Sequence, residues 1–185
     1  FLIAEKYKTK RLVREKKLNI KQIIAPKNIS NFLNILNTGN ILIDEKTCSI
    51  FLEKILTKRF NIIKQEDPIY FLKSIKNNIE INNMIKTHII DGVALTKFIY
   101  WLKNKTKLNL TEVDAQNKLE NFRKKNSTYL FPSFQTIAGS GENGAIVHYR
   151  AKKKNTKLLK KNEIFLCDSG GQYKFGTTDV TRTIC

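Results

Sequence analysis

Residues 163–183 read EIFLCDSGGQYKFGTTDVTRT, and this stretch decides the fold prediction for the second half of the chain. An apolar, strand-like segment ends in Asp168, a glycine-containing connection follows, and a β-branched segment contains Asp179. Side chains alternate along a strand, so Asp168 shares one face with Ile164 and Leu166. Antiparallel pairing of the two segments across a hairpin is therefore expected to bring both aspartates to the same face.

Two neighbouring carboxylates require a positive charge between them, because like charges repel. Arg182 alternates to the opposite face of its strand and does not suit this role. A hard divalent cation such as Mn²⁺ does suit it, since such ions favour carboxylate oxygens. On spacing alone, two surface aspartates that flank a turn remain the favoured interpretation.

The charge of the chain is strongly positive but evenly spread. The 185 residues include 34 Lys and Arg against 16 Asp and Glu, for a net charge of +18. Only six of the cations are Arg, the residue preferred for bidentate phosphate recognition. We attribute the charge to compositional drift and expect no nucleic-acid partner.

The compartment follows from what the sequence lacks. No apolar run approaches the roughly 18 residues of a membrane span, and the first residues do not form a signal-peptide core. The three cysteines have no C-x-x-C spacing, which argues against a disulfide framework or a zinc site. We therefore expect a cytoplasmic protein without a membrane partner.

The first part of the chain reads as the end of an α/β domain. Hydrophobic patterns predict, in order, a helix over 5–18, a strand over 40–44, a helix over 47–58 and a strand over 60–63. Asp67-Pro68 then interrupts the pattern and marks the predicted domain boundary.

The remainder reads as α+β. A long helix is predicted from an Asn77/Glu80 cap to about residue 103, and a second helix from a Thr111/Asp114 cap. Along the long helix an apolar stripe is expected to include a packed, structural His88. Strands are predicted over 145–149, 163–168 and 177–183.

Three stretches together resemble one family. Residues 168–183 resemble the first metal-ligand segment of the pita-bread peptidases, most closely the Xaa-Pro aminopeptidase (aminopeptidase P) branch of the creatinase/aminopeptidase family. GENGAIVHY at 141–149 is similar to the strand of that branch with a substrate-contacting histidine, and residues 80–101 are similar to the helix that opens its catalytic domain. The resemblance implies an α+β first half of a pita-bread domain over 68–185. Over 1–67 it implies the C-terminal part of a creatinase N-terminal-type α/β domain.

The resemblance also implies roles for three side chains. Asp168 would chelate one metal, Asp179 would bridge two divalent ions, which the family suggests are Mn²⁺, and His148 would bind the substrate. No residue of this chain is assigned a catalytic acid or base role. The implied reaction removes the N-terminal residue from peptides with proline in second position, and a prolidase-like dipeptidase is the sibling alternative.

The family site has three further ligands, one histidine and two glutamates, which come later than the two aspartates. The sequence ends at Cys185 without them, so we expect a truncated or split product that is inactive alone. The protein partners considered are a second polypeptide carrying the missing half and a homodimer. The alternative function is a non-catalytic pita-bread module that binds a peptide or a protein.

Overall fold

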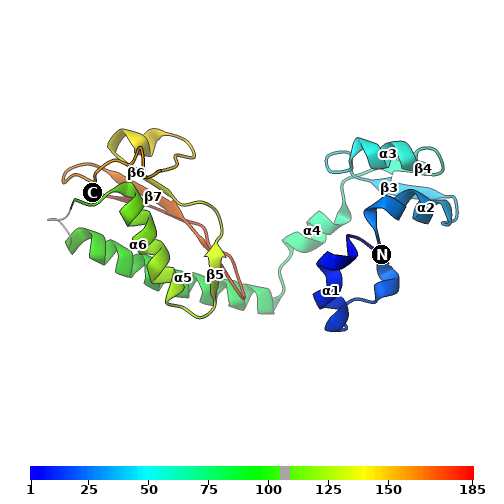
Figure 1. Cartoon of the computed structure of the whole chain (residues 1–185), viewed down its shortest axis with the longest axis horizontal. Coiled ribbons are helices and arrows are strands. Elements are labelled where there is room, and N and C mark those ends of the chain that lie inside the picture. Colours follow the sequence, from blue (N-terminus) through cyan, green and yellow to red (C-terminus); the bar gives the residue numbers. More distant parts are fainter. Residues whose placement is uncertain (105–108) are drawn as a thin grey trace. The chain divides into compact units, whose positions relative to one another are not determined.

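The computed structural model describes residues 1–104 and 109–185, which form two compact units, Phe1–Ile75 and Lys76–Cys185. Figure 1 traces the elements of each unit along the chain. The division lies a few residues beyond the predicted boundary at Pro68. Within the described residues, no helix is both long enough and apolar enough to cross a membrane.

A parallel β-α-β element forms much of the first unit. Strands β3 (Asn40–Ile43) and β4 (Asn61–Lys64) pair in parallel, and α3 (Ile50–Leu56) connects them, as the sequence predicts. The hydroxyl of Ser49 caps α3 by accepting the Leu52 N–H at 3.3 Å. The core of this unit consists of Ile29, Leu33, Ile43 and Leu56.

The rest of the first unit consists of short elements. They are β1 (Leu2–Ile3), α1 (Lys6–Arg14), η1 (Ile20–Gln22), β2 (Ile23–Ile24), η2 (Pro26–Asn28), α2 (Ile29–Asn34) and α4 (Pro68–Ser74). The helix predicted over 5–18 ends early because Lys16 adopts a left-handed backbone with φ 55°. A residue in this conformation commonly terminates a helix.

Two capped helices open the second unit, α5 (Asn78–Asn104) and α6 (Glu112–Lys124). The Asn77 side chain accepts the Glu80 N–H, and the Glu80 carboxylate accepts the Asn77 N–H, both at 2.9 Å. Thr111 and Asp114 form the same reciprocal pair, at 3.2 and 3.0 Å. Both predicted caps are confirmed.

The buried stripe of α5 differs from the predicted one. It consists of Thr87, Asp91, Ala94, Leu95 and Phe98. His88 is exposed, with Nδ1 3.0 Å from the Met84 carbonyl oxygen, so the prediction of a packed histidine is wrong. Hydrophobic periodicity misses the true stripe because two of its members, Thr87 and Asp91, are polar. Thr87 donates to the Asn83 carbonyl within α5, and Asp91 is bonded by Arg123 and Tyr173 on other elements.

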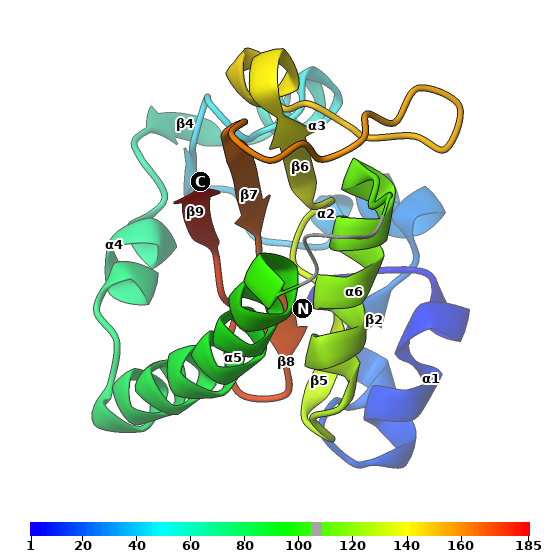
Figure 2. The same cartoon turned by 90° about the vertical axis from the view of Figure 1, so that its left-hand side faces the viewer.

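Two antiparallel ladders follow α6. Strands β6 (Ile137–Ser140), β7 (Phe165–Ser169) and β9 (Val180–Ile184) form a sheet in the order β6-β7-β9, while β5 (Tyr129–Pro132) pairs with β8 (Gly171–Tyr173). The strands predicted over 163–168 and 177–183 correspond to β7 and β9. The connection between them is not a simple hairpin turn, since the chain makes β8 before it returns (Figure 2).

The strand predicted over 145–149 is wrong. Residues Gly141–Ala145 form a 3₁₀ helix, η3, and a turn follows it. Val147 is 83% exposed, so the apolar run that suggested a strand does not enter the core. The loop is held by hydrogen bonds from Asn143 and Tyr149 to the Glu112 side chain instead of by a β-ladder.

Helices α5 and α6 cover one face of the β6-β7-β9 sheet. The shared core consists of Leu95, Phe98, Ala115, Leu119, Ala138, Phe165, Cys167 and Ile184. Leu119 and Phe98 are fully buried. The opposite face of the sheet takes no part in this core.

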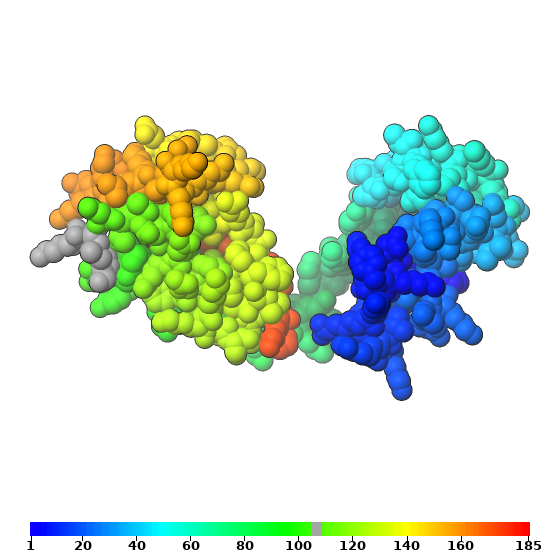
Figure 3. All heavy atoms as spheres, viewed as in Figure 1, coloured from blue at the N-terminus to red at the C-terminus, as the bar shows by residue number. Residues whose placement is uncertain are grey.

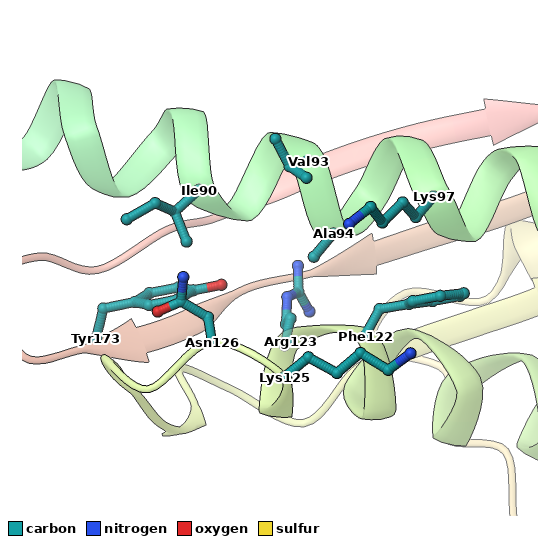
Figure 4. Close-up of a pocket in the computed structure, with 9 residues that line it drawn as sticks. All are labelled: Ile90, Val93, Ala94, Lys97, Phe122, Arg123, Lys125, Asn126 and Tyr173. Carbon is teal, nitrogen blue, oxygen red and sulfur yellow. The ribbon is translucent and has the colours of Figure 1, made fainter.

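A buried ion pair joins the two helices to the strands. Arg123 of α6 donates from Nε and Nη2 to the two carboxylate oxygens of Asp91, at 2.7 and 3.0 Å. The Tyr173 hydroxyl donates to Asp91 at 2.6 Å, and Arg123 donates to the Ser169 hydroxyl at 3.1 Å. Figure 4 shows Arg123 extending from α6 toward α5 with Tyr173 beside it.

This network keeps its charges in the interior. Asp91 and Arg123 are at most 1% exposed. Burial alone would raise the pKa of the Asp91 carboxyl, but the hydrogen bonds from Arg123 and Tyr173 and the charge of Arg123 hold it below its ordinary value. The pair is therefore ionised at neutral pH, and each partner depends on the other.

Replacing Arg123 by Ala leaves the Asp91 carboxylate buried without a counter-charge. We expect the free energy of unfolding of the second unit to fall by about 3–5 kcal/mol. Lys124→Ala, at the adjacent, exposed position, should cost less than about 0.5 kcal/mol. Urea unfolding followed by the fluorescence of Trp101 measures both, and equal losses for the two variants would contradict the assignment.

Candidate functional site

Strand alternation places Asp168 on the sheet face away from the helices. Phe165 and Cys167 of β7 are buried against α5 and α6, whereas Leu166 and Asp168 are partly exposed on the other face. Asp168 lies between Ile137 of β6 and Thr181 of β9 in the ladder. One face of the sheet thus packs against the helices, and the other face leaves Asp168 accessible to a ligand.

A pocket of about 370 Å³ opens on this second face. It is lined by Phe134, Gln135, Ile137, His148, Arg150, Asp168 and Asp179. All three side chains that the sequence singles out, His148, Asp168 and Asp179, therefore lie around one pocket. Arg182 pairs with Cys167 in the ladder and does not line the pocket, as predicted.

The two aspartates are offset rather than directly opposed. The ladder partner of Asp168 is Thr181, whose hydroxyl donates to Asp168 Oδ1 at 2.8 Å. Asp179 lies two residues before Thr181, immediately ahead of β9, and its side chain is exposed. The offset lets both carboxylates reach the same pocket without a direct carboxylate–carboxylate pairing.

The neighbours of both aspartates are fixed by buried hydrogen bonds. Ser169, next to Asp168, accepts from Arg123 and is fully buried. Thr178, next to Asp179, accepts the Gly171 N–H on its hydroxyl at 2.9 Å and the Ser133 hydroxyl on its carbonyl oxygen at 2.8 Å. The backbone at each carboxylate is thereby held by the interior of the unit.

Gly170 makes this arrangement possible through close backbone contact. A Cβ atom at this position would lie 1.9 Å from the Thr178 carbonyl oxygen and 2.3 Å from the Ser133 hydroxyl. Any side chain would push the segment before Asp179 away from β8.

A fully buried glutamate organises the loop that contains His148. Glu112, the first residue of α6, accepts the Ser140 N–H at 2.8 Å and the Lys157 N–H at 3.0 Å. It also accepts from the Asn143 amide at 2.9 Å and the Tyr149 hydroxyl at 2.8 Å. Burial alone would raise the pKa of the Glu112 carboxyl, but these four donors hold it below its ordinary value.

Sequence patterns do not reveal this role of Glu112. An acidic residue in the first turn of a helix is ordinarily explained by the helix dipole. The nearest signal in the sequence is the pair of polar side chains Asn143 and Tyr149 in the loop. Their partner, Glu112, lies 31 and 37 residues earlier in the chain. Only the tertiary structure brings the two together.

His148 lies in a turn with an unusual backbone. Its φ is 54°, in the left-handed region that non-glycine residues seldom occupy, and its side chain is exposed to the pocket. Tyr149 follows it and is held by Glu112. Such conformations persist where surrounding contacts enforce them and are frequent at functional sites.

The donor set suits a hard divalent ion but is small. Asp168 and Asp179 supply carboxylate oxygens, which Mn²⁺ and related ions prefer. Among the residues that the structure describes, no group of three or more His, Cys, Asp or Glu side chains could hold a metal ion. A separate cavity of about 140 Å³ between α5 and α6, shown in Figure 4, has Lys97, Arg123 and Lys125 in its lining and does not include the two aspartates.

Gly170→Ala introduces the clash at the Thr178 carbonyl oxygen. We expect it to destabilise the second unit by about 1–3 kcal/mol, in the range of overpacking. Gly92→Ala is the matched control, because a Cβ there meets nothing within 4 Å. In the middle of α5 that change should stabilise by up to about 1 kcal/mol. Urea unfolding of both variants tests the assignment, which fails if Gly170→Ala is neutral.

Glu112→Gln places an amide NH₂ against a backbone N–H, since each carboxylate oxygen accepts one. We expect a loss of about 1–3 kcal/mol at pH 7. The low pKa of Glu112 contributes stability above its ordinary pKa of 4.5, and protonation removes it as the pH falls. The difference in the free energy of unfolding between Glu112→Gln and the unmodified chain should therefore become smaller in acid. Glu142→Gln, at an 83% exposed carboxylate, should leave the free energy of unfolding unchanged. A deficit independent of pH would contradict the account.

The chain is similar to known proteins over much of its length. The model of the metallopeptidase family M24 matches residues 82–185. The Xaa-Pro aminopeptidase ApepP of Drosophila melanogaster is 43% identical over 140 residues, which cover 75% of this chain and 23% of that protein. A probable Xaa-Pro aminopeptidase P of Paracoccidioides brasiliensis is 48% identical over 120 residues, 63% of this chain and 20% of that protein. The chain thus spans about a quarter or less of the length of the curated relatives it matches.

Solved structures show the same fold. The X-prolyl aminopeptidase of Caenorhabditis elegans, a cytosolic enzyme with a di-nuclear active site, matches with a TM-score of 0.75 and 27% identity over 88% of this chain and 28% of that one. A prolidase of Thermococcus sibiricus matches with a TM-score of 0.74 and 25% identity, over 98% of this chain and 50% of that one. The predicted fold class, part of a pita-bread domain, is confirmed.

The family model covers more than half of the chain and includes both aspartates and His148. Together with the shared fold, this match shows that the chain belongs to the metallopeptidase family M24.

Proposed function

We propose that this chain is part of a metal-dependent aminopeptidase that releases the N-terminal residue from peptides with proline in second position. The single observation that carries the proposal is the pocket lined jointly by Asp168, Asp179 and His148. The curated relatives named as Xaa-Pro aminopeptidases support the same activity. By analogy with the cytosolic Caenorhabditis elegans enzyme, we place the protein in the cytoplasm.

Asp168 and Asp179 are the proposed metal ligands: Asp168 would hold one ion, and Asp179 would be shared by two. When bound, two divalent ions, for which we propose Mn²⁺, supply Lewis-acid chemistry and an activated water. Thr181 orients the Asp168 carboxylate through its hydrogen bond to Oδ1, as supporting residues around metal ligands commonly do.

His148 is the proposed substrate contact. A neutral imidazole can donate or accept a hydrogen bond near physiological pH, so it can bind a polar group of the peptide backbone. The left-handed turn and the Tyr149–Glu112 hydrogen bond hold the backbone of His148 at the pocket before substrate arrives. Preorganisation of this kind reduces the entropy lost on binding.

Two carboxylates alone provide too few ligands for a two-metal centre. We therefore propose that turnover requires further ligands from residues outside those of this chain, in the same polypeptide or in a second one. The second candidate function, peptide binding without catalysis, is favoured for the isolated chain by the absence of a three-ligand group among its described residues.

Release of the N-terminal residue from an Xaa-Pro-Yaa peptide with added Mn²⁺ tests the proposal. We expect no turnover by the 185-residue chain alone and restored turnover when a segment with the remaining histidine and two glutamates is supplied. Asp179→Ala should reduce the restored activity by at least about 10³-fold, because the metal centre is proposed to provide most of the rate enhancement.

Glu142→Ala, which removes an exposed carboxylate on the His148 loop, is the matched control and should retain the restored activity. Turnover that survives Asp179→Ala would contradict the metal assignment. A complemented protein that stays inactive would favour the peptide-binding alternative.

A further inference from the structure

We propose that Arg150 recognises a carboxylate of the peptide substrate, because it lines the same pocket as His148, Asp168 and Asp179 and its backbone belongs to an anchored loop. The ligand chemistry is a peptide carboxylate, which comes either from the C-terminus of a short peptide or from an acidic side chain. This inference rests on the proposed function of the pocket as a peptide site.

The guanidinium of Arg150 is free to bind a ligand. Among the residues that the structure describes, it forms no hydrogen bond or ion pair, and its side chain is exposed at the pocket. Most other arginines of the chain are occupied: Arg11 by Glu15, Arg59 by the Leu36 carbonyl, Arg123 by Asp91 and Arg182 by the Thr181 carbonyl. No ion pair joins Arg150 to Asp168 or Asp179 within the described part of the chain, although all three line the pocket.

The backbone on both sides of Arg150 is fixed. Tyr149 donates its hydroxyl to Glu112 at 2.8 Å and its N–H to the Ile146 carbonyl at 3.1 Å, while Ala151 is buried. Burial and the hydrogen bond to Glu112 raise the pKa of the Tyr149 hydroxyl to about 12, so it remains a donor at neutral pH. Tyr149 thus points to Glu112, and its two neighbours, His148 and Arg150, line the pocket.

The chemistry of arginine selects the ligand. A guanidinium presents parallel N–H donors that match the two oxygens of a carboxylate. The remaining lining, Phe134, Gln135 and Ile137, offers no second counter-charge for a substrate carboxylate. Exposed lysines follow Arg150 in the same loop, which forms surface of the second unit (orange in Figure 3), and their positive field attracts anions.

The test measures peptide affinity in the 185-residue chain at about 0.15 M salt, which limits unspecific attraction by the net charge. The readout is the shift of the His148 imidazole NMR signals, with His88 on α5 as the internal reference, since the chain has two histidines. Ala-Pro-Ala as free acid and as amide distinguishes the C-terminus. The amides of Ala-Pro-Asp and Ala-Pro-Asn distinguish an acidic side chain.

We expect at least one carboxylate peptide to bind about ten- to a hundredfold more tightly than its neutral counterpart. Arg150→Ala should remove this preference and leave the affinity for the neutral amides unchanged. Arg150→Lys should restore part of it, because the charge is kept and the paired donors are lost. Lys153→Ala, at an exposed cation of the same loop, should retain the full preference.

Equal affinity for acid and amide forms, or a preference that survives Arg150→Ala, would overturn the assignment of Arg150 and leave the proposed peptide site intact. If none of the four peptides shifts His148, the peptide site itself is wrong and this inference falls with it.

Discussion

The buried ion pair between Asp91 and Arg123 is the interaction on which the second unit depends. It links α5 to α6, and through Tyr173 and Ser169 it also holds β8 and the end of β7. Replacing such a pair by apolar residues is often neutral for stability, so its value here lies in specifying an arrangement. Its donors and acceptors can all be satisfied only when both helices and both strands are in place.

That arrangement determines where the candidate site forms. Ser169 is tied to the interior, so the preceding Asp168 must point to the other face of β7. Between β8 and β9, Thr178 forms hydrogen bonds with Gly171 and Ser133, which fix the backbone next to Asp179. A second buried carboxylate, Glu112, does the same for the loop of His148 from the start of α6. The pocket thus gathers groups from three segments whose geometry is set by polar contacts outside the pocket.

The parts of the fold that depend on local chemistry could be predicted from the sequence. The Asn77/Glu80 and Thr111/Asp114 caps, the β-α-β element of the first unit and the strands on either side of the glycines are examples, because each depends on residues close in the chain. The failures have a common physical cause. Apolar periodicity places His88 in the core because it cannot anticipate a buried Asp91, whose partner Tyr173 lies 82 residues away.

The same limit applies around the site. Residues 145–149 have the composition of a strand. The carboxylate of Glu112 instead accepts hydrogen bonds from Asn143 and Tyr149, which stabilise a 3₁₀ helix and a turn in this segment. Local sequence patterns do not predict strand β8, because its ladder partner, β5, precedes it by some forty residues, with Tyr129 opposite Tyr173. Strand alternation alone makes Asp168 and Asp179 candidates, while their metal-binding roles and the candidate His148 depend on the family resemblance. Glu112 and Arg150 are identified only by the tertiary structure.

We propose that Asp168 and Asp179 form a metal-binding site beside His148. Titration of the chain with Mn²⁺, followed by paramagnetic broadening of the two histidine imidazole signals, tests it most directly. We expect the His148 signals to broaden at a lower Mn²⁺ concentration than those of His88, which lies on α5, and the difference to disappear in Asp179→Ala. Equal broadening of both histidines, or selective broadening of His148 that persists in Asp179→Ala, would contradict it.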